Sequence, residues 1–204
     1  MHALSKKTVK TTTSTLVLSS SSRYRKELLE RLGLPFRVVV PDIDESPLPG
    51  EVPAALAMRL AAAKARAVAA AHPDSLIIGS DQVAECAGDP VGKPRDRSHA
   101  LELLRAMRGR TIVFHTAVAL LNAASGRLQS ALVDVVSTFR TLDDAALQSY
   151  VDRDDPLLCA GAVRIETLGI ALFTRVASDD PSALIGLPLI KLTDMLVEEG
   201  VAVL

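Results

Sequence analysis

The residue best suited to chemistry is Asp81, in the segment 78–82 (IGSDQ), where the apolar run of residues 76–79 gives way to polar side chains. A short apolar run of this kind indicates a buried strand. An aspartate at the end of such a strand lies against surroundings of low polarity, which suits a general base or a metal ligand. The alternative is a carboxylate that only accepts hydrogen bonds from neighbouring backbone N–H groups.

A second group of carboxylates, Asp42, Asp44 and Glu45, follows the predicted strand 36–40. Carboxylate oxygens are the ligands that Mg²⁺ prefers, and the ion usually keeps several of its waters. These residues could therefore hold a divalent metal together with Asp81. A solvated acidic turn is the alternative.

Cations that could hold phosphate are spread over three segments. The serines beginning at Ser20 open a predicted helix, whose free backbone N–H groups favour an anion, and Arg25 adds a charge there. Lys64 lies on an Ala-rich predicted helix and Lys93 lies in the rigid loop 92–94 (GKP), and lysine is a point charge well suited to phosphate. Each cation alone is more typical of a solvated surface. Together with two acidic sites they indicate metal-assisted phosphoryl chemistry.

The elements that position these residues alternate between strand and helix in the first half of the chain, and a hairpin follows. Strands are expected at 15–19, 36–40 and 76–79, and a hairpin at 111–121 and 128–139 around Gly126. Helices are expected at 23–33, 52–72, 98–107, 143–151 and 188–199. This order predicts an α/β fold with a mixed sheet, formed by one domain over residues 15–204 after a flexible tail at 1–14.

Composition narrows the class of protein. The chain has 204 residues, 49% of them hydrophobic, which is enough for one sizeable core region. Its net charge of −1 argues against a nucleic-acid partner. No apolar run approaches the ~20 residues of a membrane span, and no secretory signal is recognisable, so we expect a cytoplasmic protein without a membrane partner. Cys86 and Cys159 lack metal-ligand spacing and are expected to be idle thiols.

In this order, six motifs resemble those of the Maf family of nucleotide pyrophosphatases, over about residues 15–200. They are the serine turn with basic residues and Leu-Leu at 20–29, Asp44-Glu45, Lys64-Ala65, residues 80–83 (SDQV), residues 92–94 (GKP) and residues 186–189 (GLPL). The resemblance implies an elongated α/β fold with two lobes around a nucleotide cleft. It also implies hydrolysis of a nucleoside triphosphate to a monophosphate and pyrophosphate, and it makes a homodimer plausible.

Residue by residue, the resemblance makes Asp81 the proton acceptor that activates water. Ser20, Arg25, Lys64 and Lys93 would bind the phosphates. Glu45 would join Asp81 around a divalent metal cation, Mg²⁺ or Mn²⁺, since both ions suit carboxylate and phosphate oxygens.

The substrate base is indicated by further likeness to one branch of the family, which acts on 7-methyl-GTP. Gln82 after the aspartate, residues 159–161 (CAG) and Glu166 resemble that branch. Methylation leaves a cationic guanine, which an aromatic face attracts by roughly 0.5–2 kcal/mol. Tyr24 offers that face and Glu166 a complementary carboxylate, so Tyr24, Gln82 and Glu166 are the predicted specificity residues.

Two features of the sequence leave the identity of the substrate base undecided. The branch relatives carry tryptophan at the position of Tyr24, and tyrosine is a weaker partner for a cation. Tyr24 also recurs at a spacing of four with Leu28 and Leu32, which is equally typical of a residue facing the core. A pyrophosphatase for UTP, dTTP or modified nucleotides is therefore the alternative.

A non-catalytic nucleotide-binding regulator of septum formation is the alternative from another class. The complete set of Asp81, Lys64, Lys93 and Arg25 argues against it. His99 and His115 are not assigned to the site, because His99 adjoins a charged run and His115 lies inside an apolar strand, where a structural imidazole is expected.

Overall fold

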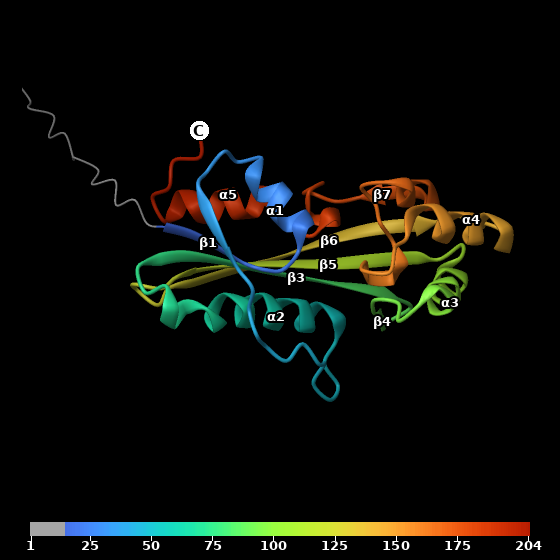
Figure 1. The fold of residues 1–204 in the computed structure, drawn as a ribbon, viewed down its shortest axis with the longest axis horizontal. Helices are drawn as coiled ribbons and strands as arrows, with labels where there is room; N and C mark the ends of the chain where they lie inside the picture. Colours follow the sequence, from blue (N-terminus) through green and yellow to red (C-terminus); the bar gives the residue numbers. More distant parts are fainter. Residues whose placement is uncertain (1–14) are drawn as a thin grey trace, which may run out of the picture.

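The computed structural model describes residues 15–204, and the predicted tail at 1–14 lies outside the described residues. In these residues seven strands form one mixed sheet in the order β2-β1-β3-β5-β6-β7, with β4 paired to the end of β3 (Figure 1). The predicted α/β fold with a mixed sheet is confirmed. The strands are β1 (Thr15–Ser19), β2 (Phe36–Val39), β3 (Ser75–Cys86), β4 (Asp89–Val91), β5 (Thr111–Asn122), β6 (Leu128–Phe139) and β7 (Phe173–Ala177).

Five α-helices cover the sheet in the described part of the chain. They are α1 (Arg23–Glu30), α2 (Pro53–Ala67), α3 (Arg97–Met107), α4 (Asp144–Asp154) and α5 (Leu189–Glu198). Four 3-10 turns connect them: η1 (Ala69–Ala71), η2 (Ala160–Ala162), η3 (Leu168–Leu172) and η4 (Ala183–Ile185). The predicted helices 23–33 and 52–72 both end earlier than expected, and the second continues only as η1. No helix within residues 15–204 is long and apolar enough to cross a membrane.

Strand β3 is the main departure from the expected elements. The sequence predicts a strand at 76–79 with Asp81 beyond its end, but β3 continues to Cys86 and Asp81 lies within it, opposite Ala117 of β5. The polar run at 80–82 breaks the apolar pattern without ending the strand, because β5 supplies backbone partners along its whole length. What ends near Asp81 is the parallel pairing with β1, whose last residue Ser19 pairs with Gly79.

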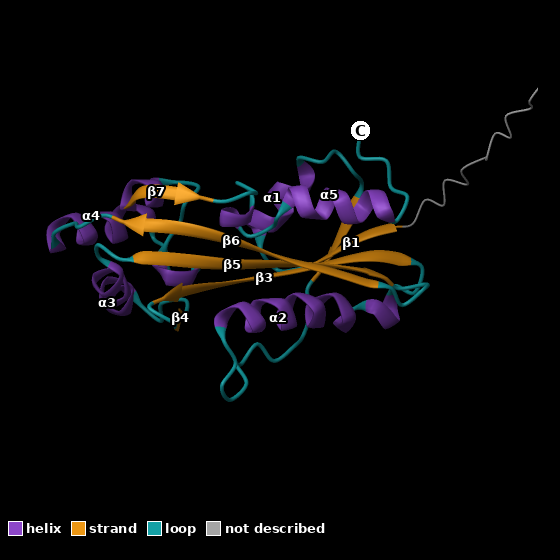
Figure 2. Cartoon of the chain, turned by 180° about the vertical axis from the view of Figure 1, so that it is seen from behind, coloured by secondary structure: helices purple, strands orange, loops and turns teal. Residues whose placement is uncertain are grey.

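One face of the sheet carries two separate hydrophobic cores. Near β1, Leu28 of α1 and Leu192 of α5 pack on the sheet with Leu187. Near the other end, Leu104 of α3 and Leu147 of α4 pack with η2 and η3. The two cores lie along the long axis of the molecule, which is visibly elongated in Figures 1 and 2. The gap in side-chain packing between them falls beside the end of β1.

The opposite face is covered by α2, which packs unusually close to the sheet. Its Ala57 and Ala61 contact Ala117 and Ala119 of β5, and small side chains allow this approach. A Cβ on Gly79 would lie 2.1 Å from the carbonyl oxygen of Ala61, so only glycine fits there. The close packing holds α2, and with it Lys64, at a fixed height above β3.

Candidate active site

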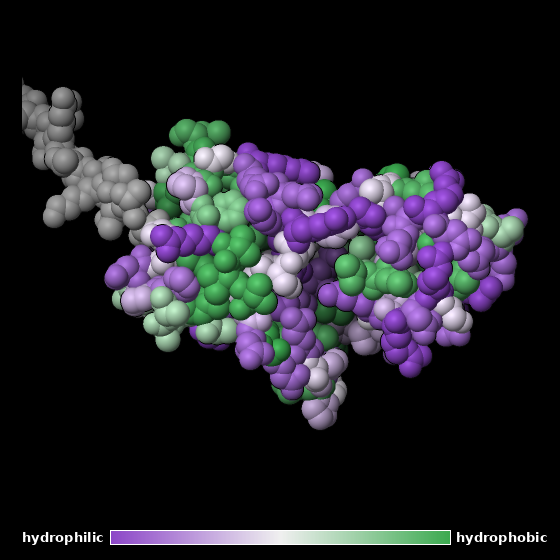
Figure 3. Space-filling view, in the orientation of Figure 1, coloured by the Kyte–Doolittle hydropathy of each residue, from purple (hydrophilic) through white to green (hydrophobic). Residues whose placement is uncertain are grey.

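A cavity of about 650 Å³ lies between the two cores, within the usual size range of sites for small molecules. Figure 3 shows the surface hollowed between the two ends of the molecule. We call this space the central cavity. All nine residues predicted for the site line it: Ser20, Tyr24, Arg25, Glu45, Lys64, Asp81, Gln82, Lys93 and Glu166. The structure therefore brings these residues together, from segments that are up to 146 positions apart.

The acidic end of the central cavity is organised by Lys64. Its Nζ lies 2.6 Å from Oδ1 of Asp81 and 2.8 Å from Oε1 of Glu45. Lys64 and Asp81 are buried, whereas half of the Glu45 side chain is exposed. Ser19 Oγ donates to the Lys64 carbonyl oxygen at 2.6 Å and ties α2 to the end of β1. A buried ammonium and a buried carboxylate in contact satisfy each other, as burial of charge requires.

The segment between β2 and α2 brings Glu45 to this place. Arg59 of α2 anchors that segment, since its Nε donates to Glu51 at 2.6 Å and a terminal nitrogen donates to the Ser46 carbonyl oxygen at 2.9 Å. The hydrogen bond from Arg59 lowers the pKa of Glu51 to about 2. Burial raises the pKa of Glu45, but the hydrogen bond and charge of Lys64, with the charges of Lys93 and Arg25, shift it downward overall. Glu45 is therefore held in its ionised form.

Arg25 approaches the same end from α1. Ser22 caps that helix by accepting from the Arg25 backbone N–H at 3.4 Å, and Ser20 Oγ accepts from the Ser22 N–H at 3.1 Å. Nε of Arg25 donates to the Gly186 carbonyl oxygen at 2.8 Å, which fixes the guanidinium. Burial lowers the pKa of Arg25, and the nearby Asp81 and Glu45 partly oppose this shift. The remaining guanidinium nitrogens are left for an anion.

The donor set at this end suits a metal carried by the substrate. No group of three or more His, Cys, Asp and Glu residues within 15–204 is arranged to hold a metal ion without help. Asp81 and Glu45 supply two carboxylates, and Lys64 contacts only one oxygen of each. Mg²⁺ is commonly held by one or two carboxylates together with phosphate oxygens and water. Asp81 and Glu45 therefore fit such an ion when a phosphate completes its coordination.

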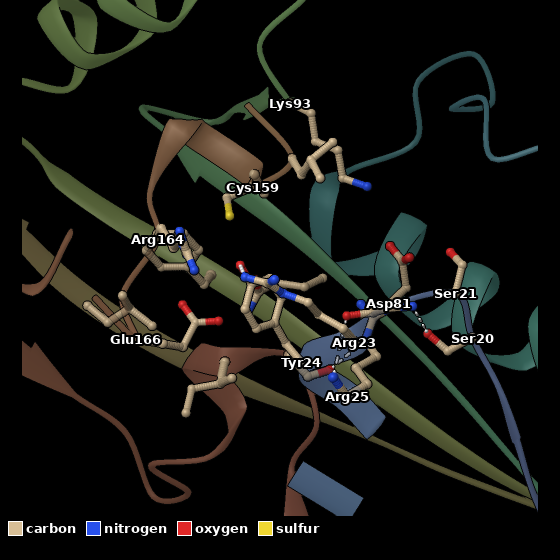
Figure 4. A pocket seen from close by; sticks show the side chains of 18 of the residues that line it. Ser20, Ser21, Arg23, Tyr24, Arg25, Asp81, Lys93, Cys159, Arg164 and Glu166 are labelled. Carbon is tan, nitrogen blue, oxygen red and sulfur yellow. Dashed lines mark hydrogen bonds between the residues drawn. The ribbon is translucent and has the colours of Figure 1, made fainter. Parts of the chain in front are cut away.

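The other end of the central cavity is formed by Tyr24 and the segment between η2 and η3 (Figure 4). The Arg23 guanidinium lies 4.7 Å from the centre of the Tyr24 ring, and that of Arg164 lies 5.9 Å from it. Tyr24 thus faces the cavity rather than the core. Glu166 also lines this part of the cavity, and desolvation by burial raises the pKa of its carboxyl.

Arg164 is a site residue that the sequence argument missed. Its Nε is buried without a hydrogen-bond partner among residues 15–204. It lines the central cavity, and its backbone N–H donates to the Tyr150 hydroxyl at 2.9 Å. The one sequence feature that could have identified Arg164 is its position two residues before Glu166, but neither hydrophobic periodicity nor a motif distinguished it from a solvated arginine.

His115, which was left out of the predicted site, has the structural role that the sequence predicts. His115 is buried outside the central cavity, with Nδ1 2.7 Å from Asp134 and Nε2 3.0 Å from Glu85, as a structural imidazole. Cys86 and Cys159 are both free. Cys159 lines the cavity, and burial raises the pKa of its thiol to about 11, which favours the unreactive neutral form.

The fold and the central cavity define an α/β protein whose site suits a small phosphorylated molecule with a ring at its other end. Lys64, Asp81 and Glu45 contact one another at one end, and Tyr24 lies with Arg23, Arg164 and Glu166 toward the other. The sequence model of the Maf-like protein family matches residues 15–199, and the chain belongs to that family.

Curated relatives match nearly the whole chain. A protein of Thiobacillus denitrificans is 52% identical over 193 residues, covering 95% of this chain and 96% of its own. One of Polaromonas sp. is 53% identical over 191 residues, covering 94% and 87%. One of Ralstonia nicotianae is 55% identical over 181 residues, covering 89% and 93%. Each of the three is named 7-methyl-GTP pyrophosphatase.

Proposed function

We propose that this protein hydrolyses nucleoside triphosphates between the α and β phosphates, with 7-methyl-GTP as its substrate. The observation that carries the proposal is the contact of Lys64 with both Asp81 and Glu45 at the end of the cavity opposite Tyr24 and Glu166. The names of the relatives, which share about half of their residues with this chain, support the same activity and base.

In the proposed reaction, Asp81 accepts a proton from a water molecule as the water oxygen bonds to the α-phosphorus. The bond from the α-phosphorus to the bridging oxygen breaks, and pyrophosphate leaves with a nucleoside monophosphate as the other product. Arg25, Lys64 and Lys93 hold the phosphates, and the Ser20 segment contributes polar groups at the helix start. Asp81 suits the base role because its second oxygen is left uncontacted by Lys64.

The balance of charges around Asp81 and Glu45 suits a divalent cation bound together with the triphosphate. Arg25, Lys64 and Lys93 oppose two carboxylates, which leaves one net positive charge against the several negative charges of a triphosphate. We propose that Asp81 and Glu45 hold Mg²⁺ or Mn²⁺ together with the phosphates. When bound, such an ion polarises the phosphoryl oxygens and neutralises developing charge.

The base would stack on Tyr24 and lie beside Glu166. A methylated guanine is cationic, so an aromatic face and a carboxylate both attract it. A second candidate substrate, UTP or dTTP, is favoured by a different observation. Arg23 and Arg164 already lie near the Tyr24 ring, and their charges would repel a cationic base but not a neutral one.

We expect the protein to act in the cytoplasm, with the nucleotide as its partner, and without binding nucleic acid or a membrane. A homodimer is a further prediction, drawn from the resemblance to the family. Size-exclusion chromatography with light scattering would measure the oligomeric state directly.

The proposal is tested by steady-state hydrolysis of 7-methyl-GTP, GTP, UTP and dTTP with Mg²⁺ or Mn²⁺. We expect 7-methyl-GTP to give the highest kcat/KM and to release pyrophosphate. Asp81→Asn should lower kcat by roughly 10²–10⁴-fold, the usual contribution of a general base. The matched control is Asp89→Asn, at an exposed carboxylate of β4 outside the cavity, which should retain full activity.

The other outcomes separate the alternatives. Preference for UTP or dTTP would preserve the chemistry and overturn the base assignment. Absence of turnover with either metal would overturn the enzyme proposal. Nucleotide binding that persists in that case would favour the non-catalytic regulator.

A further inference from the structure

The side-chain amide of Gln82 is held in one orientation by three acceptors. Its Nε2 lies 2.8 Å from Thr116 Oγ1, 2.9 Å from the Ala183 carbonyl oxygen and 3.1 Å from the Leu184 carbonyl oxygen. A backbone carbonyl oxygen can only accept. Turning the amide over would place Oε1 against both of these oxygens, and the Leu184 carbonyl oxygen would lose its Gln82 donor. The observed orientation is therefore the one that the surroundings allow.

Thr116 completes this arrangement because its own proton is already committed. Its Oγ1 donates to the Ala183 carbonyl oxygen at 2.9 Å, so toward Gln82 it can only accept. Thr116 is fully buried, and it lies directly opposite Gln82 in the pairing of β5 with β3. The hydroxyl thus acts as a third acceptor that faces Nε2.

The consequence concerns the other atom of the amide. Gln82 lines the central cavity, and no donor among residues 15–204 hydrogen-bonds its Oε1. This oxygen is also not among the buried side-chain atoms that lack a partner. Oε1 is therefore an accessible acceptor, and it cannot exchange places with the amino group as an unrestrained glutamine amide can.

We propose that Thr116 is a positioning residue that keeps Gln82 Oε1 as a fixed acceptor for an N–H group on the edge of the substrate base. The proposal rests on the proposed function, since it requires the base of a bound nucleotide to lie against Gln82, which contacts η4, whereas its neighbour Asp81 contacts Lys64 of α2. Guanine and 7-methylguanine present an amino group and a ring N–H side by side. Uracil and thymine present one N–H between two carbonyl oxygens, and those oxygens are repelled by a fixed acceptor.

The test uses Thr116→Val, which keeps the shape and removes the hydroxyl, with Thr116→Ser as the rescue. Thr111→Val, at an exposed position of the same strand, is the control. Binding of 7-methyl-GMP and UMP is measured by calorimetry alongside hydrolysis of 7-methyl-GTP and UTP. Thr116→Val should weaken 7-methyl-GMP binding by about 3–10-fold, the range of one neutral hydrogen bond, and should leave UMP binding unchanged or tighter.

If Thr116 has a purely structural role, Thr116→Val should weaken the binding of 7-methyl-GMP and UMP equally, and that result overturns the proposal. A raised KM for 7-methyl-GTP with little change in kcat, restored by Thr116→Ser, supports it. Urea unfolding of each variant separates this selectivity from a loss of folded protein.

The two proposals fail in different ways. Wild-type protein that binds 7-methyl-GMP in preference to UMP but hydrolyses no triphosphate would overturn the proposed function and support the fixed acceptor. Wild-type protein that hydrolyses triphosphates but binds 7-methyl-GMP and UMP equally would support the proposed hydrolysis and overturn the fixed acceptor. Absence of binding to either monophosphate overturns the fixed acceptor as a base-reading group.

Discussion

Lys64 joins the two carboxylates on which the proposed chemistry depends. It is buried, lies within 2.8 Å of both Asp81 and Glu45, and comes from the helix that Gly79 brings close to the sheet. A bound triphosphate would add negative charge here, so Lys64 could turn part of its hydrogen bonding to phosphate, and Asp81 and Glu45 would then be free to hold a divalent metal. The contact thus keeps like charges together before substrate arrives.

At the opposite end, Glu166 makes the preference for a cationic base depend on pH. Desolvation raises the pKa of this carboxyl above its ordinary value, so it becomes neutral at a higher pH than an exposed glutamate does. Its attraction for a cationic base is present above that pKa and is lost as the pH falls through it. We expect the ratio of kcat/KM for 7-methyl-GTP to that for GTP to fall on acidification.

The ratio is the right measurement because the groups that act on the phosphates affect both substrates alike. Glu166→Gln should lower the ratio at neutral pH by roughly 3–10-fold, between the effects of a screened ion pair and a charge-assisted hydrogen bond. The same variant should remove the pH dependence of the ratio. A pH dependence that survives in Glu166→Gln would assign it to another group.

Among the elements, α2 and β3 show how backbone packing controls the site. A Cβ on Gly79 would lie 2.1 Å from the Ala61 carbonyl oxygen and 2.7 Å from the Ala65 nitrogen. Gly79→Ala must push α2 outward, and overpacking of this kind costs about 1–3 kcal/mol. Because α2 carries Lys64, we expect a lower urea midpoint and a lower kcat/KM together.

Gly92→Ala is the matched control for this change. No atom lies within 4 Å of a Cβ added there, so the urea midpoint should stay near that of the wild type. If Gly79→Ala loses stability but keeps full kcat/KM, the height of α2 above the sheet does not control Lys64.

The elements also show what the sequence could and could not predict. Apolar periodicity located the five helices and most strands, because each buries one face. The strand predicted from this periodicity ends earlier than β3 does, because the side chains at 80–82 are polar and interrupt the apolar pattern. Thr116 was not recognisable, because β3 and β5 are joined through α3 and nothing local sets the register that places it opposite Gln82.

The site residues were identified through the ordered motifs rather than through periodicity. Ser20, Lys64 and Asp81 each had an ordinary structural alternative, and only their combination indicated phosphoryl chemistry. Arg164 escaped this reasoning because its segment, between η2 and η3, has neither helical nor strand periodicity. Its place follows from long-range contacts with Tyr150 and Tyr24.

Over the whole molecule, the central cavity takes its lining from both hydrophobic cores, so a bound nucleotide should stabilise them together. Arg25 lies on α1, which packs in the core at the β1 end, and Arg164 and Glu166 follow η2 of the other core, while Lys64 comes from α2 on the opposite face. Mass action gives about 2.7 kcal/mol of stabilisation at a ligand concentration of 100 Kd, which for a chain of this size raises Tm by roughly 5–10 °C.

Differential scanning calorimetry with an α,β-methylene analogue of 7-methyl-GTP and Mg²⁺ measures this effect without turnover. We expect one transition that moves upward as a whole, with calorimetric and van't Hoff enthalpies in agreement. UMP at the same concentration is the comparison ligand and should shift Tm less, because it lacks the cationic base and two phosphates. Two transitions, of which only one responds to the analogue, would show that the nucleotide contacts a single core and that the cavity does not couple the two.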